Sequence, residues 1–509
     1  MNPSCSDPCA EGERLAAEGR LADAIDCYRA AIAAHPDDAR TLFAMARTAE
    51  TLKMTAAAEA LLLRLLELSP GRLEVVVTLA NLWRRVGKYR DAETLLRHTI
   101  AKGEAAELWL TLGSVCRETG DDAAAESNYR KALALRPDYP EALGNLAEIL
   151  SDRGETDAAF ALYDRVLTAR PESAKARLNC AFIRLTAGDL EAGWNGYAAR
   201  LMMPEAPRPD HNLPRWDGVL KPGLRLLVAA EQGIGDQIMF GSLIPELAGR
   251  LKEIGGRLVL ACEPRLVPLF ARSFPDVVVH GVTVKTCGGR TQAYYGWLAD
   301  LGGADAFVEI GTLPAFLRRH IADFPDSHAY LKPDETEIAR WRAVFAALPA
   351  PRLGLSWRSG KIGGARNREI APLEAWANFV RLLPGTPIAA QYGAGAEEIA
   401  RLAALSGRTI FVPPALDQKN ELDRTAAMLS ALDGVVSAPT AVSWLAAACG
   451  TPVWKILARP SWTAFGRHRE PFAPAARCIA ANGEWTAAFA AAGTEITDRL
   501  LPSPAADLN

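Results

Sequence analysis

The sequence lacks several features that would point directly to a class of function. Its 57 lysine and arginine residues are balanced by 60 acidic ones, so no basic excess indicates a nucleic-acid partner. No apolar run reaches the roughly 18 residues needed to span a bilayer. The first residues, Met-Asn-Pro-Ser-Cys-Ser-Asp, carry neither the basic nor the apolar region of a signal peptide. We therefore expect a cytoplasmic protein.

Cysteine and metal-binding patterns are also missing. The nine cysteines have no repeated spacing, and their odd number fits neither a disulfide framework nor a zinc site. No convincing Asp-x-Asp motif is present. We expect no metal and no cofactor. The length of 509 residues exceeds what one hydrophobic core supports, which predicts two or more domains.

The first two hundred residues repeat, and three sets of positions share one period. The first set occupies a turn between two helices: Gly19, Lys53, Gly87, Gly120, Gly154 and Gly188. Successive members are 34, 34, 33, 34 and 34 residues apart. Five residues after each turn comes a small residue: Ala24, Ala58, Ala92, Ala125, Ala159 and Gly193. Four residues further on comes a bulky one: Tyr28, Leu62, Leu96, Tyr129, Tyr163 and Tyr197.

This pattern is typical of stacked helical hairpins. Glycine relieves the turn, the small residue lets the helices approach, and the bulky residue fills the remaining gap. Each hairpin buries its apolar face only against its neighbours. The register resembles the tetratricopeptide repeat, with five full copies and a degenerate sixth over residues 6–200. The resemblance implies an α solenoid that binds a peptide or protein; a generic alanine-rich helical bundle is the alternative.

Helix and strand patterns alternate after a proline-rich linker at 201–222. Strands are predicted at Leu224–Ala230, Arg257–Cys262, Asp276–His280, Arg352–Trp357, Pro387–Gln391, Thr409–Val412, Gly434–Ser437 and Val453–Leu457. Helices are predicted near Asp236 and at Leu373–Leu383, Ala396–Leu405, Asp423–Leu432 and Thr440–Cys449, while Gly281–Leu313 is left unassigned. Such alternation predicts two parallel-sheet lobes, at residues 223–335 and 350–480, with a ligand at the carboxyl ends of their strands. A C-terminal helix and tail follow over 481–509.

The first lobe contains the most informative stretch, Glu-Gln-Gly-Ile-Gly-Asp at 231–236. Gly233 and Gly235 would let a substrate approach the backbone at a helix N-terminus. Asp236 is predicted to be an exposed carboxylate that takes a proton from an attacking hydroxyl, with Glu231 as the second candidate. Two alternatives are open: Asp236 is only an N-cap, or the glycines belong to a nicotinamide site, for which a third glycine is missing.

Ser437, Thr440 and Ala441 mark a strand end and a helix start in the second lobe. The N–H groups and dipole of such a helix suit a phosphate. The alternative is that Ser437 and Thr440 only cap the helix.

A third group in the second lobe is basic. Ser356, Arg358 and Lys361 end another strand beside glycines, with Arg366 and Arg368 close behind. Arginine offers a forked donor to phosphate, which favours a donor-binding role; a solvated basic loop is the alternative.

The chain also resembles a known family of enzymes. Pro-Arg-Trp-Asp-Gly at 214–218, the stretch at 231–236 and Pro245 are similar to the entry of a heptosyltransferase-like domain, of the family 9 type, found behind tetratricopeptide repeats in many bacterial proteins. The resemblance implies the GT-B fold with two Rossmann-like lobes, a nucleotide-sugar donor and no metal. It also implies that Asp236 is the catalytic base.

Residues 433–454 are similar to the donor loop of the same family, with two departures. Ala438-Pro439 replaces the usual acidic position, and Trp444 stands where a histidine is expected. We therefore expect a different nucleotide sugar.

These resemblances imply a metal-independent glycosyltransferase that moves a sugar onto a protein acceptor recruited by the repeats. The Ser-Ala-Pro-Thr loop and Ser-Trp-Thr-Ala-Phe-Gly at 461–466 resemble repeat-linked enzymes proposed to glycosylate flagellin on Ser or Thr, often with acidic nine-carbon sugars. Two alternatives stay open. The enzyme transfers to a lipid-linked or capsular glycan, or the protein is a non-catalytic scaffold with a decayed transferase domain.

Overall fold

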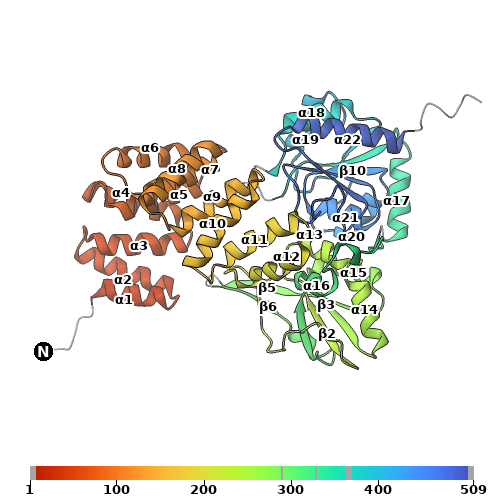
Figure 1. The fold of residues 1–509 in the computed structure, drawn as a ribbon, viewed down its shortest axis with the longest axis horizontal. Coiled ribbons are helices and arrows are strands. Elements are labelled where there is room, and N and C mark those ends of the chain that lie inside the picture. Colours follow the sequence, from red (N-terminus) through yellow and green to blue (C-terminus); the bar gives the residue numbers. More distant parts are fainter. Residues whose placement is uncertain (1–6, 288–289, 327–328, 361–368, 502–509) are drawn as a thin grey trace, which may run out of the picture. The chain divides into compact units, whose positions relative to one another are not determined.

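The computed structural model describes residues 7–287, 290–326, 329–360 and 369–501. It divides into two compact units, Met1–Ala176 and Arg177–Asn509. The helices of the first unit are α1 (Pro8–Ala17), α2 (Leu21–Ala34), α3 (Ala39–Thr51), α4 (Thr55–Leu68), α5 (Leu73–Arg85), α6 (Tyr89–Ile100), α7 (Ala106–Glu118), α8 (Asp122–Leu135), α9 (Pro140–Asp152) and α10 (Thr156–Ala169) (Figure 1). A sixth hairpin, α11 (Ala174–Thr186) and α12 (Leu190–Tyr197), begins at the division, so most of it belongs to the second unit.

The backbone of the turns confirms the predicted repeat register. All six predicted turn residues, including Lys53, have φ between 59° and 85°. This left-handed region favours glycine, which explains glycine at five of the six turns. The predicted small and bulky residues of every hairpin are buried.

The second unit holds three sheets. Its strands are β1 (Arg208–Pro209), β2 (Arg225–Ala229), β3 (Arg257–Cys262), β4 (Val278–Gly281), β5 (Thr283–Cys287), β6 (Arg290–Tyr294), β7 (Ala306–Glu309), β8 (Arg352–Ser356), β9 (Thr386–Ala389), β10 (Gly434–Ser437), β11 (Val453–Leu457) and β12 (Ala476–Ala480). The first lobe is built on a parallel sheet of order β4-β3-β2-β7, and the second on a parallel sheet of order β12-β11-β10-β8-β9. A small third sheet has the order β1-β6-β5.

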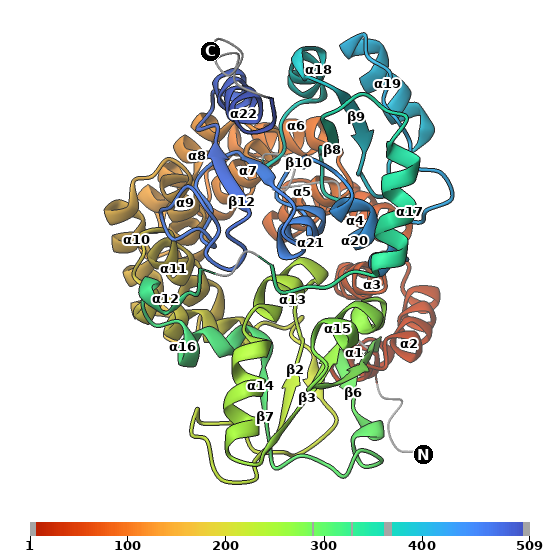
Figure 2. The ribbon, with the colours of Figure 1, turned by 90° about the vertical axis from the view of Figure 1, so that its right-hand side faces the viewer.

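Helices cover these sheets unequally. They are α13 (Ile234–Gly241), α14 (Ile244–Glu253), α15 (Val267–Ser273), α16 (Leu313–Leu317), α17 (Glu335–Phe345), α18 (Leu373–Leu382), α19 (Ala396–Ser406), α20 (Leu422–Ser430), α21 (Ala441–Ala448) and α22 (Trp485–Leu500) (Figure 2). In the second lobe, Val435 packs with α20 and α21 while its neighbour Val436 packs with α18 and α22, so both faces are covered by helices. In the first lobe, Leu226 packs with α14 and α15, but Leu227 packs with residues of β6 and the segment before β7.

The structure differs from the predicted strands at three places. One is β12, at the edge of the second parallel sheet, which was not predicted. Thr409–Val412 forms only a single bridge, Phe411 to Ile388, instead of the predicted strand. The unassigned segment 281–313 contains β5, β6 and β7, of which β7 completes the first parallel sheet. A hairpin of polar strands carries little periodic apolar signal, which explains why β5 and β6 were not predicted.

The sixth hairpin shares one hydrophobic core with both lobes. Trp194 on α12 is buried, with its ring centroid 6.4 Å from Phe240 of α13 and 5.7 Å from Phe465, beyond β11. Its indole N–H donates to the carbonyl of Arg318 over 2.9 Å. The predicted solenoid extends to residue 200, but its last hairpin is packed as part of the α/β unit.

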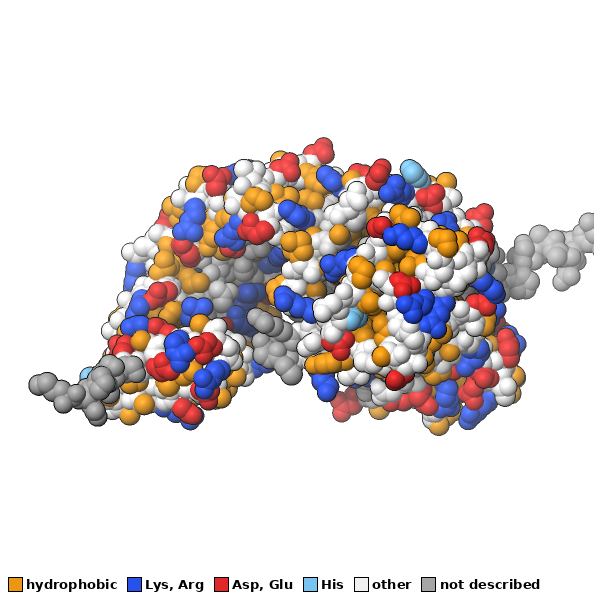
Figure 3. Space-filling model, turned by 90° about the horizontal axis from the view of Figure 1, so that it is seen from below, with side chains coloured by type: hydrophobic (Ala, Val, Ile, Leu, Met, Phe, Trp, Pro, Cys, Tyr) orange, Lys and Arg blue, Asp and Glu red, His pale blue; other side chains and the backbone are white. Residues whose placement is uncertain are grey.

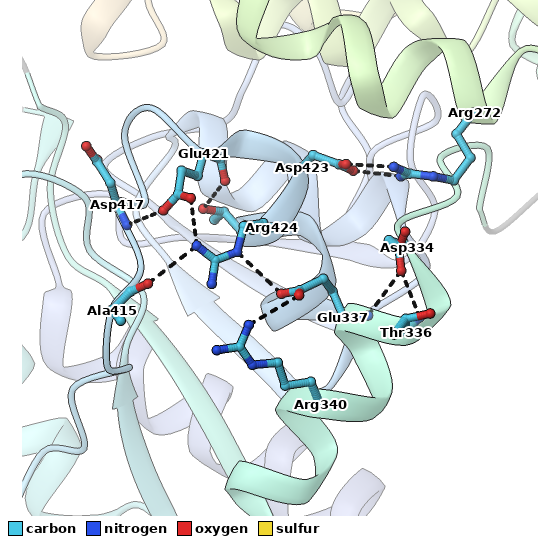
Figure 4. A network of polar contacts seen from close by, with 11 residues as sticks. Arg272, Asp334, Thr336, Glu337, Arg340, Ala415, Asp417, Glu421, Asp423 and Arg424 are labelled. Atoms are coloured by element: carbon cyan, nitrogen blue, oxygen red, sulfur yellow. Dashed lines mark hydrogen bonds and ion pairs between the residues drawn. The ribbon is translucent and has the colours of Figure 1, made fainter.

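A network of ion pairs joins the two lobes on the side of α15 and α20 (Figure 4). Arg272 of α15 donates through both terminal nitrogens to Asp423 of α20, each over 2.7 Å. Arg424 lies 3.3 Å from Glu337 of α17 and 2.6 Å from Glu421. Forked pairs of this kind fix orientation as well as distance, so they align α20 against the first lobe.

The surface carries charges of both signs. Figure 3 shows basic and acidic side chains interspersed over one face, in keeping with a formal net charge of −3. Within the described part of the chain, we find no helix that combines the length and the apolar character required to cross a membrane.

The shared core predicts that Trp194→Ala destabilises the α/β unit. Truncating a buried tryptophan costs about 3–5 kcal/mol, and here the loss falls on α13, α16 and the segment 461–466. Hydrogen exchange measured by mass spectrometry should rise in those segments. Tyr129→Ala, at the equivalent kind of buried position in the first unit, is the matched control and should raise exchange in α7 and α8. Changes confined to α11 and α12 in Trp194→Ala would contradict the shared core.

Candidate functional site

Asp236 lies in the first turn of α13, directly after the carboxyl end of β2. Gly233 occupies the N-cap, so Asp236 does not hold the N-cap position of the predicted alternative, although its carboxylate accepts backbone hydrogen bonds from Gly233 and from its own N–H. Asp236 is half-buried rather than exposed as predicted. Its pKa is raised to about 6, chiefly by burial and then by the charge of Glu231, while a backbone hydrogen bond from Gly233 opposes the rise. The result is a carboxyl that exchanges its proton near neutral pH, which suits a general base.

Glu231 is buried beside Asp236 and has a single charged partner. Its Oε1 accepts from Arg200 Nε over 2.9 Å and lies 2.8 Å from Arg200 Nη2. Its Oε2 is buried and has no hydrogen-bond partner among the described residues. Burial raises the pKa of Glu231, and Arg200 opposes that rise.

Arg200 was missed by the sequence analysis. It lies in a short 3-10 helix, η1 (Ala198–Met202), that follows α12, and its side chain is only 7% exposed. Nη2 donates to Thr312 over 2.8 Å, and the guanidinium stacks over Tyr197 with its carbon 4.6 Å from the ring centroid. Gln232 donates to the Tyr197 hydroxyl over 2.9 Å. The available signal was a lone arginine in an apolar stretch, because a buried guanidinium requires a carboxylate.

Glycines make room for this arrangement at two points. A Cβ on Gly311, in the 3-10 helix η4 (Ile310–Thr312), would lie 3.0 Å from Arg200 and 3.0 Å from Glu231 Oε1. A Cβ on Gly235 would lie 3.3 Å from Trp444 Cδ1 and 3.9 Å from the backbone nitrogen of Ala441. The first turns of α13 and α21 therefore meet where the two lobes adjoin (Figure 2).

The predicted donor loop ends in buried hydroxyls. Ser356, Ser437 and Thr440 are buried, and the Thr440 oxygen lies 3.4 Å from that of Ser356 and 3.3 Å from that of Ser437. Thr440 occupies the N-cap of α21, yet its side chain makes no capping hydrogen bond. Ser437 donates to the carbonyl of Ala438 instead. The alternative that both residues cap the helix is therefore wrong, and the first N–H groups of α21 have no side-chain cap.

The basic group of the second lobe is partly neutralised. Arg358 Nε donates to Glu398 of α19 over 2.6 Å, and Trp357 donates to the same carboxylate over 2.8 Å. The hydrogen bond to Glu398 raises the pKa of Arg358. Lys361, like Arg366 and Arg368, lies outside the described residues.

Trp444 fills the place where a histidine was expected. Its ring lies over the Lys455 ammonium at 3.7 Å from nitrogen to centroid. Lys455 is bound to Glu470 over 2.5 Å, and both side chains are buried. A second oxygen of Glu470 is buried and has no partner within the described ranges. The Lys455 ammonium is therefore occupied by its buried ion pair with Glu470, next to Trp444 of α21.

No three His, Cys, Asp or Glu side chains in the described part of the chain come together as metal ligands. Two predicted positions, Asp236 and Ala441, are brought close through Gly235. The hydroxyls of the donor loop form a separate buried cluster with Gln391, which lies 3.4 Å from Ser356.

Comparison with known proteins supports the repeats and identifies a full-length relative. Residues 9–72 and 104–172 match models of the tetratricopeptide repeat. Protein FlbA of Caulobacter vibrioides is 32% identical over 489 residues, covering 94% of this chain and 82% of FlbA.

The solved structures are similar over about a third of the chain. The thermophilic repeat protein TTC0263 of Thermus thermophilus is 27% identical, with 35% of this chain and 97% of that one covered and a TM-score of 0.31. YrrB, a repeat protein with an unusual peptide-binding site, is 19% identical, with 34% and 91% covered and a TM-score of 0.26. With such low TM-scores, neither likeness supports a conclusion about this chain.

Gly311→Ala should disturb the Arg200–Glu231 pair. Its Cβ would be pressed against both members, which overpacks the site at a cost of about 1–3 kcal/mol in the free energy of unfolding. Urea unfolding measures this change. Gly296→Ala is the control, because its Cβ would enter open space and its unfolding free energy should shift by less than about 0.5 kcal/mol. Equal effects of the two substitutions would contradict the close packing at Gly311.

The raised pKa of Asp236 predicts a pH-dependent gain from Asp236→Asn. The native state holds the proton more tightly than the unfolded chain, so the stability due to protonated Asp236 is present below about pH 4 and is lost as the pH rises through about 6. At about pH 7.5 the neutral variant should therefore be more stable by about 1–3 kcal/mol, a range that discounts for partial exposure. The difference should vanish near pH 4.

Unfolding free energies measured between pH 4 and 8 test this expectation. Asp276→Asn, at an exposed aspartate paired with Lys252, is the control and should show no such gain. A constant difference between Asp236→Asn and the wild type at all pH values would contradict the raised pKa.

Proposed function

The chain belongs to the family of the Caulobacter vibrioides protein FlbA, and for this member we propose a glycosyltransferase activity that moves a sugar from a nucleotide-sugar donor to a protein. Under this proposal the two parallel-sheet lobes form a GT-B fold. The repeats hold the acceptor, because solenoids of this kind present extended binding surfaces for peptides and proteins.

The observation that carries the proposal is the meeting of α13 and α21. It sets Asp236, whose pKa is raised to about 6, one residue from the contact between Gly235 and the uncapped first turn of α21. A group that removes a proton from a nucleophile and a group that stabilises a departing anion are the two elements that direct displacement requires.

The proposed reaction is one displacement at the anomeric carbon. Asp236 accepts the proton of an acceptor hydroxyl as the oxygen attacks that carbon. The bond from the carbon to the donor phosphate breaks, and its electron pair leaves with the nucleotide. The backbone N–H groups and dipole of α21 stabilise the negative charge that forms on the phosphate. No metal enters this scheme.

Donor recognition in the proposal depends on backbone more than on charged side chains. The hydroxyls of Ser356, Ser437 and Thr440 are buried and bonded within the protein, so they shape the loop ahead of α21. Lys455 is committed to Glu470, and Arg358 to Glu398. Trp444 in place of a histidine supports a donor different from that of heptosyltransferases.

For the acceptor, we propose a Ser or Thr hydroxyl of flagellin. The support is the resemblance of the Ser-Ala-Pro-Thr loop and of residues 461–466 to repeat-linked enzymes proposed to modify flagellin. Transfer to a lipid-linked or capsular glycan is distinguished by the same experiment, since it leaves protein masses unchanged.

One observation favours a second candidate, a non-catalytic scaffold. The cations Arg358 and Lys455, which could meet a phosphate, are both neutralised by carboxylates of the protein. A scaffold would bind a protein through the repeats and no nucleotide sugar through the lobes.

Asp236→Asn should separate the chemistry from donor binding. The variant loses the proton acceptor, so transfer should fall by about 10²–10⁴-fold while stabilisation by the donor is kept. A panel of nucleotide sugars is screened by thermal shift, and transfer to flagellin is measured by intact mass. Asp276→Asn, at an exposed aspartate whose partner is Lys252, should behave as wild type.

A loss of transfer in Asp236→Asn with an unchanged thermal shift supports the proposal. Full transfer by Asp236→Asn would exclude Asp236 as the base. A wild-type protein that responds to no nucleotide sugar and changes no protein mass favours the scaffold.

A further inference from the structure

We propose that Arg200, which follows the last helix of the repeat array, is a positioning residue for the carboxyl pair Glu231 and Asp236. The inference rests on the proposed function, since it concerns how Asp236 becomes an effective base. Under this inference, the residue directly after the sixth hairpin takes part in the proposed reaction.

Several contacts hold the Arg200 side chain in place against the carboxylate of Glu231. Nε and Nη2 both reach Glu231 Oε1, at 2.9 and 2.8 Å, so the pair is held by two contacts to one oxygen. Thr312 accepts from Nη2, the Tyr197 carbonyl accepts from Nη1 over 3.3 Å, and the Tyr197 ring lies against the guanidinium. Gly311 leaves the space that the pair occupies. A side chain fixed at this many points holds Glu231 in one orientation.

Burial makes the charge of Arg200 necessary. The side chains of Arg200 and Glu231 are 7% and 8% exposed, and a buried carboxylate without a cation takes up a proton instead of staying ionised. Arg200 lowers the pKa of Glu231 against the rise that burial causes, and negative charge on Glu231 raises the pKa of Asp236. Arg200 acts on Asp236 through Glu231.

Other charged and titratable groups surround the pair without replacing Arg200. They are Tyr197 on α12, Glu309 at the end of β7, Tyr295 after β6, Asp210 after β1 and Arg215, which binds Glu309 over 2.6 Å. Glu309 adds negative charge near Glu231. Arg215 forms an ion pair with Glu309 and so does not pair with Glu231. From the second lobe, the atoms that approach Gly235 belong to Trp444 and Ala441, which do not titrate.

A double-mutant cycle tests whether Arg200 acts through Glu231. Arg200→Met removes the cation that favours ionised Glu231, and Glu231→Gln removes the carboxylate itself. Asp236 loses its negative neighbour in both variants, so each should lower kcat about tenfold with little change in the donor KM. The double variant Arg200→Met/Glu231→Gln should be no slower than either single variant, because both remove the same effect. Arg319→Met, at an exposed arginine, is the matched control and should leave kcat and its pH profile unchanged.

The pH profile distinguishes positioning from a purely structural role. In Arg200→Met, loss of the cation should raise the pKa of Glu231 above its wild-type value, so kcat should show a rise with pH that the wild-type profile lacks. The double variant has no Glu231 carboxyl and should lack this rise. Arg200→Lys retains a cation, so it should recover activity relative to Arg200→Met and keep the profile of the wild type.

The outcomes separate this inference from the proposed function. Additive losses in the double variant, or a pH-independent loss in Arg200→Met, would overturn the role of Arg200 while leaving the transferase in place. A wild-type protein without transfer would instead remove the proposed function. If Arg200→Met does not fold, the test uses Arg200→Lys and the double variant instead. The double variant should fold because it leaves no unpaired charge in the protein interior. A double variant much slower than Glu231→Gln would then overturn the inference.

Discussion

A helical hairpin of this repeat class cannot bury its apolar face alone, and the main core of the second unit is where the last hairpin meets that requirement. Within an array, the next hairpin supplies the cover. For α11 and α12 the α/β unit supplies it: Trp194 and Tyr197 lie in a core shared with both lobes. The hairpin is thus held between β-α elements that are distant in sequence. Arg200, in the short helix that directly follows α12, is placed by this packing.

Charge inside this core is handled by pairing. Arg200 with Glu231 and Lys455 with Glu470 are each buried, and each leaves one carboxylate oxygen without a partner among the described residues. Such pairs add little to stability compared with apolar residues of the same size, since the cost of removing both charges from water is large. An arrangement that separates the two members of such a pair is nevertheless unfavourable, because it leaves a buried charge without a partner. The two pairs lie on either side of the contact between α13 and α21, so both constrain how these helices meet.

Local and periodic signals made the repeats and most parallel strands predictable. The six turns were identified because one backbone conformation recurs at one spacing, and Lys53 was placed by spacing although it is not glycine. β3, β10 and β11 were predicted at the bounds that the structure has, since each is a short, mainly apolar segment between turns. The hairpin of β5 and β6 was not predicted, because its strands are polar. Thr409–Val412 carries a strand-like composition but has only one bridge partner.

Residues of the candidate site were predictable where a local sequence pattern identifies them. They were not predictable where residues distant in sequence are brought together by packing. Asp236 and the glycines before it follow from a strand-turn-helix pattern. Arg200 lies 31 residues before Glu231, and no sequence pattern relates the two. Likewise, the pairing of Arg358 with Glu398 joins two elements whose contact is set by the sheet order. Half-burial of Asp236, on which its raised pKa depends, is also a property of the assembled lobes.

The division after Ala176 has a consequence for how such proteins can diversify. The buried residues of the core that α11 and α12 share with the lobes begin at Ala181, so the hairpins before α11 can drift in number and sequence without altering that core. The sixth hairpin has no such freedom, because its buried residues lie in it. The first five hairpins and the α/β unit can thus change at separate rates within one gene, while α11 and α12 are constrained by the core in which they lie.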